Sequence, residues 1–356
     1  MSTHRKLLTW VLGVLLIPMA CSVVRFLTYQ EKGDACEMVV LQPNIDPYMK
    51  FQDMPQEKQT EILLHLADSL VTPETDYIVG PETFINSPFV WESSIDEHPE
   101  ILKLKAFMKQ FPDAHFVIGA STWKLYGDPA DFTPSSRIFR GGPERYDYFN
   151  SALQIDSSGE IPLYRKSMLV TGVEKMPYKE YLGFLENLVV NLGGAMRSNG
   201  IQEFRDAFPS PLDSTRVGPV ICWESVFGEY VTDYVGEAGA HFLFIITNDG
   251  WWRNTAGYRQ HNSYARLRAI ENRRSVARSA NTGISSLIDQ RGVELARIGW
   301  WERSGIRGTL YKNDKLTFYV KHGDYLGRMA VLVAAILLLY SFVFKYIKNN
   351  TLRKPT

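Results

Sequence analysis

Two long apolar runs, one near each end of the chain, dominate its hydrophobic pattern. Residues 7–24 contain no charged side chain, and residues 329–344 are equally uncharged between Arg328 and Lys345. A run of about 20 apolar residues can cross the hydrocarbon core of a bilayer as a helix. The second run is shorter, but it reaches that length if residues 346–347 extend it and Lys345 snorkels to the surface. We therefore predict two transmembrane helices.

The basic residues outside these runs predict how the chain is oriented. Lys and Arg are enriched on the cytoplasmic side of membrane segments, so both tails are expected in the cytoplasm, with residues ~30 to 327 outside it. For the first run the alternative is a cleaved signal peptide, although Pro18 makes a lipoprotein-type site before Cys21 a poor match. For the second run the alternative is a buried core helix, which the flanking basic residues disfavour. The predicted parts are an N-terminal helix and linker (1–30), a central domain (31–327), and a C-terminal helix with a basic tail (328–356).

Between the two runs, short apolar stretches alternate with amphipathic ones. Residues 37–42 and 241–247 are rich in β-branched and aromatic side chains, which is typical of buried strands. Residues 56–70 instead repeat Ile and Leu on one helical face. Further strands are expected at 77–79, 115–118 and 216–221, and further helices at 99–111 and 258–274. This alternation predicts an α/β domain with helices on the faces of a sheet.

Charge and cysteine content narrow the possible functions. Lys+Arg and Asp+Glu both number 39, so no net field would recruit nucleic acid, and none is expected as a partner. Three cysteines provide no disulfide framework. His261 has no partner at metal-ligand spacing, since neither His-x-x-x-His nor Cys-x-x-Cys occurs. We therefore expect neither a metal nor another cofactor.

Three chemically active side chains each follow an apolar strand. Cys222 comes directly after residues 216–221, and Glu82 and Lys166 follow two other predicted strands. A thiol is mostly protonated at neutral pH, so it needs a base or a nearby cation to act as a nucleophile. A carboxylate could take that proton, and an ammonium group could stabilise the oxyanion formed on a carbonyl. If the fold brings these strand ends together, they form a catalytic site; otherwise Cys222 is simply a small buried hydrophobe. Histidine could serve as the base instead, but none of the seven stands at a comparable strand end.

Short segments in a fixed order resemble a known family. They are Gly80-Pro-Glu-Thr83, Phe149-Asn-Ser-Ala152, Tyr164-Arg-Lys166, the stretch from Leu169 to Pro177, Ile221-Cys-Trp-Glu-Ser225, Thr247-Asn-Asp-Gly-Trp-Trp252, Gln260-His261, Ala265 to Glu271, and Arg278 to Ile284. Each is weak alone, but together they resemble the nitrilase (carbon–nitrogen hydrolase) superfamily over roughly residues 37–325. Within it, the chain is most similar to the apolipoprotein N-acyltransferase family.

The resemblance implies a fold and an activity. The fold would be a nitrilase-like αββα sandwich of two packed sheets, forming a catalytic domain over residues 31–327. The activity would be transfer of a fatty acyl group from a phospholipid, through a thioester on Cys222, to the N-terminal amine of a diacylglyceryl-cysteine lipoprotein. The partners would then be a phospholipid donor, an apolipoprotein acceptor and the membrane. Such a protein would lie in the bacterial inner membrane, with its catalytic domain in the periplasm.

The resemblance also gives each site residue an expected role. Glu82 would be the base and acid, and Lys166 would hold the oxyanion together with the backbone N–H after Cys222. Glu174 would be a second active-site carboxylate. The supporting residues would be Asn150, Trp223 and Glu224, and the substrate-binding residues would be Phe51, Trp251 and Trp252. For the two tryptophans, simple packing at a sheet edge is the alternative.

Some features depart from the family pattern and keep alternatives open. One apolar run precedes the domain where the family has several transmembrane helices, Thr171-Gly-Val173 stands where it has Pro-Phe, and Phe51 replaces a tryptophan. The alternatives are a membrane-tethered hydrolase of the same superfamily, acting on an amide, and an inactive truncated remnant. The intact Glu82, Lys166 and Cys222 argue against the remnant.

Two segments have an ordinary interpretation beside a functional one. Arg266, Arg268, Arg273 and Arg274 are expected to form a solvated, salt-bridged helix face. Residues 181–192 are too apolar for an ordinary loop, so they predict either a core helix or a lid that lies on the membrane.

Overall fold

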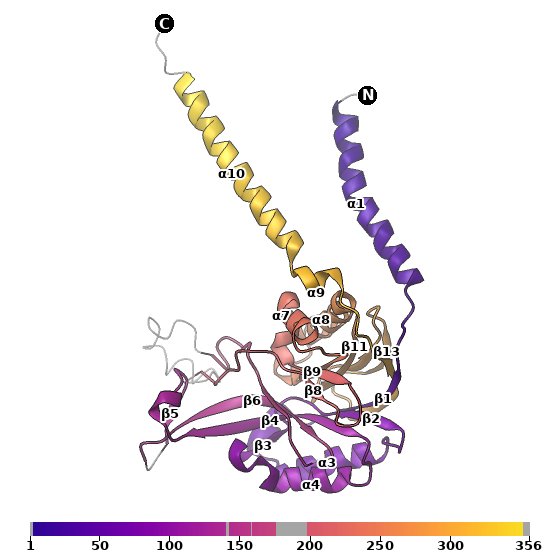
Figure 1. Ribbon diagram of the computed structural model, residues 1–356, viewed down its shortest axis with the longest axis vertical. Coiled ribbons are helices and arrows are strands. Elements are labelled where there is room, and N and C mark those ends of the chain that lie inside the picture. The colour runs from indigo at the N-terminus through magenta and orange to yellow at the C-terminus, as the bar shows by residue number, and fades with distance from the viewer. Residues whose placement is uncertain (1–2, 140–141, 158, 176–197, 352–356) are drawn as a thin grey trace.

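The structure is a computed structural model that describes residues 3–139, 142–157, 159–175 and 198–351. The apolar stretch 181–192, interpreted above as a core helix or a lid, lies outside the described residues. Two sheets form the centre of the domain (Figure 1).

The first sheet has eight strands and mixes parallel with antiparallel neighbours. Its order is β14 (Ser304–Tyr311), β1 (Ala35–Gln42), β2 (Thr75–Val79), β4 (His115–Tyr126), β6 (Arg145–Ile155) and β5 (Arg137–Ile138), with β3 (Ile85–Trp91) on β4 and β7 (Leu163–Arg165) on β6. β1, β2 and β4 are parallel, so their carboxyl ends reach the same edge. Glu82, three residues beyond β2, is placed at that edge.

The second sheet has six strands. Its order is β13 (Glu294–Ile298), β12 (Ser285–Ile288), β11 (Ser275–Ala280), β10 (Phe242–Thr247), β9 (Arg216–Ile221) and β8 (Phe208–Pro209). β9, β10 and β11 are parallel to one another. Cys222 follows β9 directly, and Asp249 follows β10 at the same edge.

Alternate residues of the central strands face different layers. In β1, Met38 and Val40 pack with the second sheet, whereas Val39 and Leu41 pack with the helices on the outer face. Period-two alternation puts these neighbours on opposite faces, and each fully buried Val or Leu contributes about 1.5–3 kcal/mol. The helices are α3 (Gln56–Asp68) and α4 (Pro99–Met108) outside the first sheet, and α7 (Gly228–Gly236) and α8 (Ala256–Asn272) outside the second (Figure 1). The predicted αββα sandwich is confirmed.

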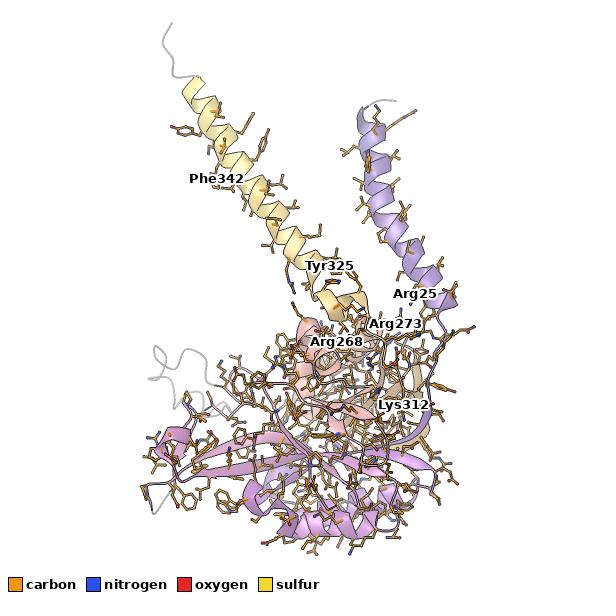
Figure 2. All side chains as sticks on the ribbon, viewed as in Figure 1. Arg25, Arg268, Arg273, Lys312, Tyr325 and Phe342 are labelled. Carbon is orange, nitrogen blue, oxygen red and sulfur yellow. The ribbon has the colours of Figure 1, made fainter. Side chains whose placement is uncertain are left out.

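Both terminal apolar runs are helical, as α1 (Thr3–Thr28) and α10 (Tyr325–Thr351). By length and composition, Arg5–Thr28 and Tyr325–Ile347 could each cross a membrane, and neither is buried in the protein. Both helices leave the domain on the side of α7, α8 and the short α9 (Phe318–His322), and they extend in the same general direction (Figure 1). Their side chains project outward on all sides (Figure 2). A helix that is apolar all round is suited to lipid rather than water.

The expected arginine face on the helix at 258–274 is partly wrong. The helix ends at Asn272 because Arg273 adopts a left-handed conformation with φ of 50°. Arg268 and Arg274 are only 4% and 1% exposed. Arg274 donates to the carbonyls of Ala240 at 2.7 Å and Lys315 at 2.9 Å, so it joins segments of the domain instead of facing solvent.

Candidate active site

The ends of β2, β7 and β9 bring their polar residues to one place between the two sheets. Lys166 follows β7, and its backbone N–H donates to the carbonyl of Asn150 on the neighbouring β6 at 2.8 Å. The Lys166 ammonium lies 3.1 Å from Glu82 Oε1. Cys222 lies near this pair, because the charges of Glu82 and Lys166 both act on its thiol and shift its pKa in opposite directions. Three strand ends thus bring Glu82, Lys166 and Cys222 near one another, and their catalytic roles stay predictions.

The turn that presents Glu82 requires a glycine on the neighbouring strand. Thr83 has a φ of 46°, and the Gly119 N–H donates to the Pro81 carbonyl at 3.1 Å. A Cβ on Gly119 would lie 2.4 Å from the Thr83 nitrogen and 2.6 Å from the Glu82 Cα. Only a residue without a side chain lets β4 approach this turn so closely.

One ammonium group is shared between two carboxylates in the site. Lys166 Nζ lies 2.9 Å from Glu174 as well as 3.1 Å from Glu82. Burial favours the neutral amine, but Glu174 and Glu82 outweigh it and hold the pKa of Lys166 well above its ordinary value. Lys166 in turn lowers the pKa of Glu174 against the effect of burial. Asn150 completes the group, because its Nδ2 donates to Glu82 at 2.7 Å and to Glu174 at 2.9 Å.

Cys222 is held in an unusual backbone conformation at the start of η4 (Cys222–Val226). Its φ of 50° is uncommon for a residue with a side chain, and such conformations persist where the surroundings fix them. Burial and the Glu82 carboxylate raise the pKa of the thiol, while Lys166 opposes them. The group therefore rests as a neutral thiol near neutral pH, and Glu82 is the carboxylate that raises its pKa most strongly.

Glu224 ties the two sheets together just behind the site. One oxygen, Oε1, accepts from the Ser167 N–H at 2.7 Å, and the other accepts from the Ile221 N–H at 2.8 Å. These amides belong to the residue after Lys166 and the residue before Cys222. Three tyrosine hydroxyls also donate to this fully buried carboxylate, from Tyr164, Tyr230 and Tyr234. Glu224 thus contacts the backbone beside both Lys166 and Cys222, and its supporting role in catalysis stays a prediction.

The three expected substrate-binding aromatics do not form one group. Phe51, on α2 (Pro47–Gln52), stacks on Trp251 with ring centroids 6.0 Å apart, and Tyr48 meets Trp251 edge-on. All three rings are exposed. Trp252 instead packs edge-to-face against His261 at 5.0 Å. Trp223 packs against Phe227.

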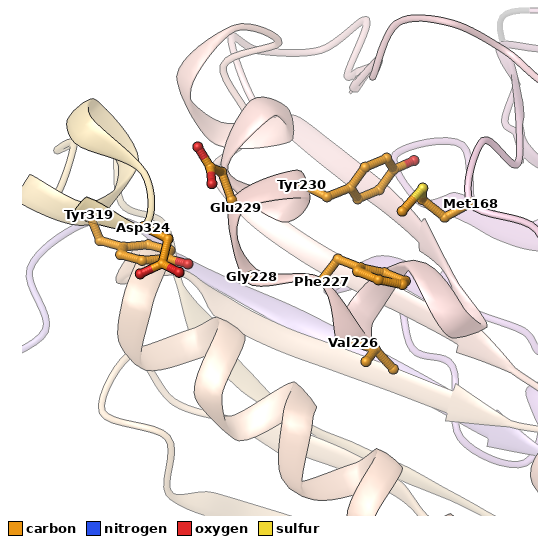
Figure 3. A pocket seen from close by; sticks show the side chains of 8 residues that line it. All are labelled: Met168, Val226, Phe227, Gly228, Glu229, Tyr230, Tyr319 and Asp324. Carbon is orange, nitrogen blue, oxygen red and sulfur yellow. The ribbon is translucent and has the colours of Figure 1, made fainter. Parts of the chain in front are cut away.

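A cavity of about 400 Å³ lies where η4, α7 and α9 meet. Met168, Phe227 and Tyr230 line one side, with Tyr319 and Asp324 across from them (Figure 3). Its place is next to the start of α10, at the side of the domain from which both terminal helices leave. Among the residues that the structure describes, no group of three or more His, Cys, Asp or Glu is arranged to hold a metal ion.

Sequence reasoning missed two buried groups in the site. Lys50 is 1% exposed, and its Nζ donates to the Glu82 carbonyl at 3.1 Å and the Thr83 hydroxyl at 3.4 Å. Asp249, His261 and Arg278 form a second group, with His261 Nδ1 2.9 Å from Asp249 and Arg278 2.8 Å from the same carboxylate. Asp249, His261 and Arg278 lie within segments that resemble the family, whereas Lys50 lies in none of them. Charged residues usually indicate solvent exposure, so their local pattern gave no sign of burial.

A family model for carbon–nitrogen hydrolases matches residues 40–312, and the chain belongs to this family. An apolipoprotein N-acyltransferase of Chlorobaculum tepidum is 32% identical over 320 residues, covering 86% of this chain and 57% of the relative. Another, from Geobacter metallireducens, is 29% identical, covering 97% of this chain and 61% of the relative. The chain thus spans less than two thirds of the length of these relatives. A carbon–nitrogen hydrolase structure from Helicobacter pylori is similar in fold, with a TM-score of 0.53 and 14% identity over 84% of this chain and 94% of that one.

Lys50 should make stability depend on pH. Burial lowers the pKa of Lys50 from 10.5 to about 7 in the folded protein, with Glu82 opposing the shift. Between these values the unfolded chain binds a proton that the folded protein does not. The free energy of unfolding should therefore rise with pH, by at most about 1.4 kcal/mol per unit from this group.

Urea unfolding in detergent at pH 7, 8 and 9 measures this effect. As pH rises, the free energy of unfolding of wild type should increase relative to that of Lys50→Met. Lys58→Met, at an exposed position of α3, is the control and should follow the wild-type curve. If the free energies of unfolding of wild type and Lys50→Met change equally with pH, the lowered pKa of Lys50 is contradicted.

Proposed function

We propose that this chain is a membrane-bound N-acyltransferase that works through a thioester on Cys222. The acyl donor is a phospholipid, and the acceptor is the N-terminal amine of a diacylglyceryl-cysteine lipoprotein. The observation that carries the proposal is the convergence of Glu82, Lys166 and Cys222 between the two sheets. The similarity to apolipoprotein N-acyltransferases over most of this chain supports the choice of substrates.

The first half-reaction forms the thioester. Glu82 takes the proton of the Cys222 thiol, and the sulfur attacks the ester carbonyl of the phospholipid. The oxyanion that forms is stabilised by the Lys166 ammonium and the backbone N–H of Trp223. The carbon–oxygen bond then breaks, and the lysophospholipid oxygen leaves with the proton held by Glu82.

The second half-reaction moves the acyl group to the acceptor. The lipoprotein amine attacks the thioester carbonyl, Glu82 takes a proton from the amine, and the sulfur leaves to become a thiol again. Glu174 keeps Lys166 charged and positioned without taking part in proton transfer. Asn150, which donates to both carboxylates, fixes their orientation.

The position of the two terminal helices supports the proposal that the substrate comes from the membrane. In this proposal they anchor the domain of residues 31–327 to the outer face of the bacterial inner membrane, with residues 1–30 and 328–356 as the anchors. Both helices leave the same side of the domain (Figure 1). The exposed rings of Phe51, Trp251 and Tyr48 would contact the lipid part of a substrate, since aromatic side chains suit a membrane interface.

A tethered hydrolase of the same family is the second candidate. It is favoured by one observation, that the family model matching residues 40–312 is that of carbon–nitrogen hydrolases. It would use the same residues but deliver the acyl group to water. The experiments below separate the two functions by their products.

Removal of the nucleophile should abolish transfer. We expect Cys222→Ala to form no N-acylated lipoprotein, because no thioester can form without the thiol. Mass spectrometry of wild-type protein from membranes should find an acyl adduct on Cys222. Cys36→Ala is the matched control, since burial and Asp76 raise the pKa of that thiol to about 12, and it should retain activity. Full activity in Cys222→Ala would contradict the thioester mechanism.

Removal of the base should slow transfer strongly. Glu82→Gln keeps the shape of the side chain but cannot take the thiol proton, so we expect a loss of at least ~10²-fold in rate. Glu100→Gln, at a buried glutamate on α4, is the control and should stay near wild type. The measurement is formation of lysophospholipid and N-acyl product in vesicles. If Glu82→Gln acylates normally, the base lies elsewhere; if free fatty acid is the only acyl product, the hydrolase is favoured.

The orientation in the membrane can be tested independently of chemistry. Basic residues flank the outer ends of both apolar runs, so both termini should be cytoplasmic and the domain periplasmic. A charged side chain at the bilayer centre costs roughly 2.5–3.5 kcal/mol on insertion scales, and neither run contains one before Lys345. Reporters fused after Tyr29 or before Arg328, with protease added to spheroplasts, should find an accessible domain. A protected, cytoplasmic domain would exclude lipoprotein acylation.

A further inference from the structure

A buried charged group stands directly behind the nucleophile. Asp249 lies on η5 (Asp249–Trp252), His261 on α8 and Arg278 on β11, and all three side chains are at most 1% exposed. His261 Nδ1 lies 2.9 Å from Asp249 Oδ1 and 3.0 Å from an Arg278 nitrogen. Its other nitrogen, Nε2, lies 3.1 Å from the carbonyl oxygen of Cys222. The group therefore touches the backbone of Cys222 and not its thiol.

The contacts of Nε2 determine where one proton is. The hydroxyl of Ser225 donates its single proton to the Cys222 carbonyl at 2.7 Å. Nε2 lies 3.0 Å from that hydroxyl oxygen, which can then only accept from it. Both neighbours of Nε2 are thus acceptors, so Nε2 carries a proton whether or not Nδ1 does. Asp249 and Arg278 hold the ring in this orientation from the other side.

The carbonyl that His261 contacts belongs to the same peptide group as the Trp223 N–H. A trans peptide is planar, with its C=O and N–H pointing in opposite directions. A hydrogen bond to the oxygen polarises the whole group and makes its N–H a stronger donor. The Trp223 N–H is in the first turn of η4, where backbone N–H groups find their acceptors outside the helix.

We infer that His261 is a positioning residue for the oxyanion site: its Nε2–H holds and polarises the peptide group that joins Cys222 to Trp223. The inference rests on the proposed function in one respect, the use of the Trp223 N–H as an oxyanion donor. Buried charges cost desolvation energy, and hydrophobic residues of similar size would hold a backbone turn at lower cost. A hydrogen-bonded chain, in which Asp249 and Arg278 hold His261 and His261 donates to this peptide, explains why charged residues occupy the space.

Two reactions of the Cys222 thiol distinguish polarisation of the Cys222–Trp223 peptide group from simple support of the backbone turn. Alkylation of Cys222 by iodoacetamide displaces iodide at a saturated carbon and forms no oxyanion. Acylation by p-nitrophenyl butyrate forms an oxyanion as sulfur attacks the carbonyl, then releases p-nitrophenolate as the carbon–oxygen bond breaks. Its burst measures acyl-enzyme formation without any assumption about the natural acyl donor. Both rates are measured on the full chain in detergent, in protein that also carries Cys36→Ala.

His261→Leu should lower the p-nitrophenolate burst rate about tenfold or more, because the donor to the peptide is lost. The rate of iodoacetamide labelling at Cys222 should stay within about twofold. His261→Gln places an amide N–H near the position of Nε2, and its burst rate should recover to within about threefold of wild type.

The matched control is His115, an equally buried histidine remote from Cys222. It lies 3.2 Å from Asp156 and 3.1 Å from Ser210, so it has the same kinds of partner. His115→Leu should change neither rate, which separates loss of a buried imidazole from loss of this one. Thermal unfolding identifies any variant that fails to fold.

Three results would overturn the inference: an unchanged burst rate in His261→Leu, an equal fall of both rates, or no recovery in His261→Gln once that variant is folded. The substrate assignment fails separately. If wild type shows the burst with p-nitrophenyl butyrate but forms no thioester from phospholipid vesicles, the acyl donor is wrong and the role of His261 stands.

Discussion

The site depends on the hydrogen bonds that the buried carboxylate of Glu224 accepts. The two sheets meet through apolar contacts, which fix their separation but not the register of one strand end against another. Glu224 supplies that register, because it accepts from the backbone next to Lys166 and from the backbone next to Cys222. An oxyanion donor that is displaced by about 1 Å loses much of its effect. The charge-assisted hydrogen bonds of Glu224 therefore matter for the geometry of the site more than their energy alone suggests.

Two carboxylates and one ammonium group surround the Cys222 thiol. Glu174 and Glu82 share the Lys166 ammonium, so neither carboxylate is fully neutralised, and Lys166 remains a cation. Burial raises the pKa of the Cys222 thiol, so the proton stays on the sulfur near neutral pH. Lys50 adds a second donor beneath Glu82, at its backbone rather than its carboxylate.

Both terminal helices are joined to the same layer of the domain. α10 begins close to the cavity beside η4, and the ion pair between Glu229 and Arg328 joins α7 to the first turns of that helix. On the other side, the Tyr29 ring at the end of α1 lies under the Arg273 guanidinium at 4.4 Å. Both terminal helices thus connect to the second sheet and its helices, the layer that carries Cys222.

Local pattern determined most of the architecture. Strand alternation, helical periodicity and two uncharged apolar runs depend on neighbours within a few residues, and these predicted the α/β layers and the terminal helices. The strand-end positions of Glu82, Lys166 and Cys222 likewise follow from short apolar runs, which is why a shared rim could be predicted. Tertiary structure decided what depends on contacts between distant segments. Arg268 and Arg274 had the pattern of a solvated face, yet both are buried and donate to backbone carbonyls of other segments. Lys50 and the Asp249–His261–Arg278 group are invisible to periodicity for the same reason: a charged side chain can be buried only where remote donors and acceptors satisfy it, and no local pattern records those partners.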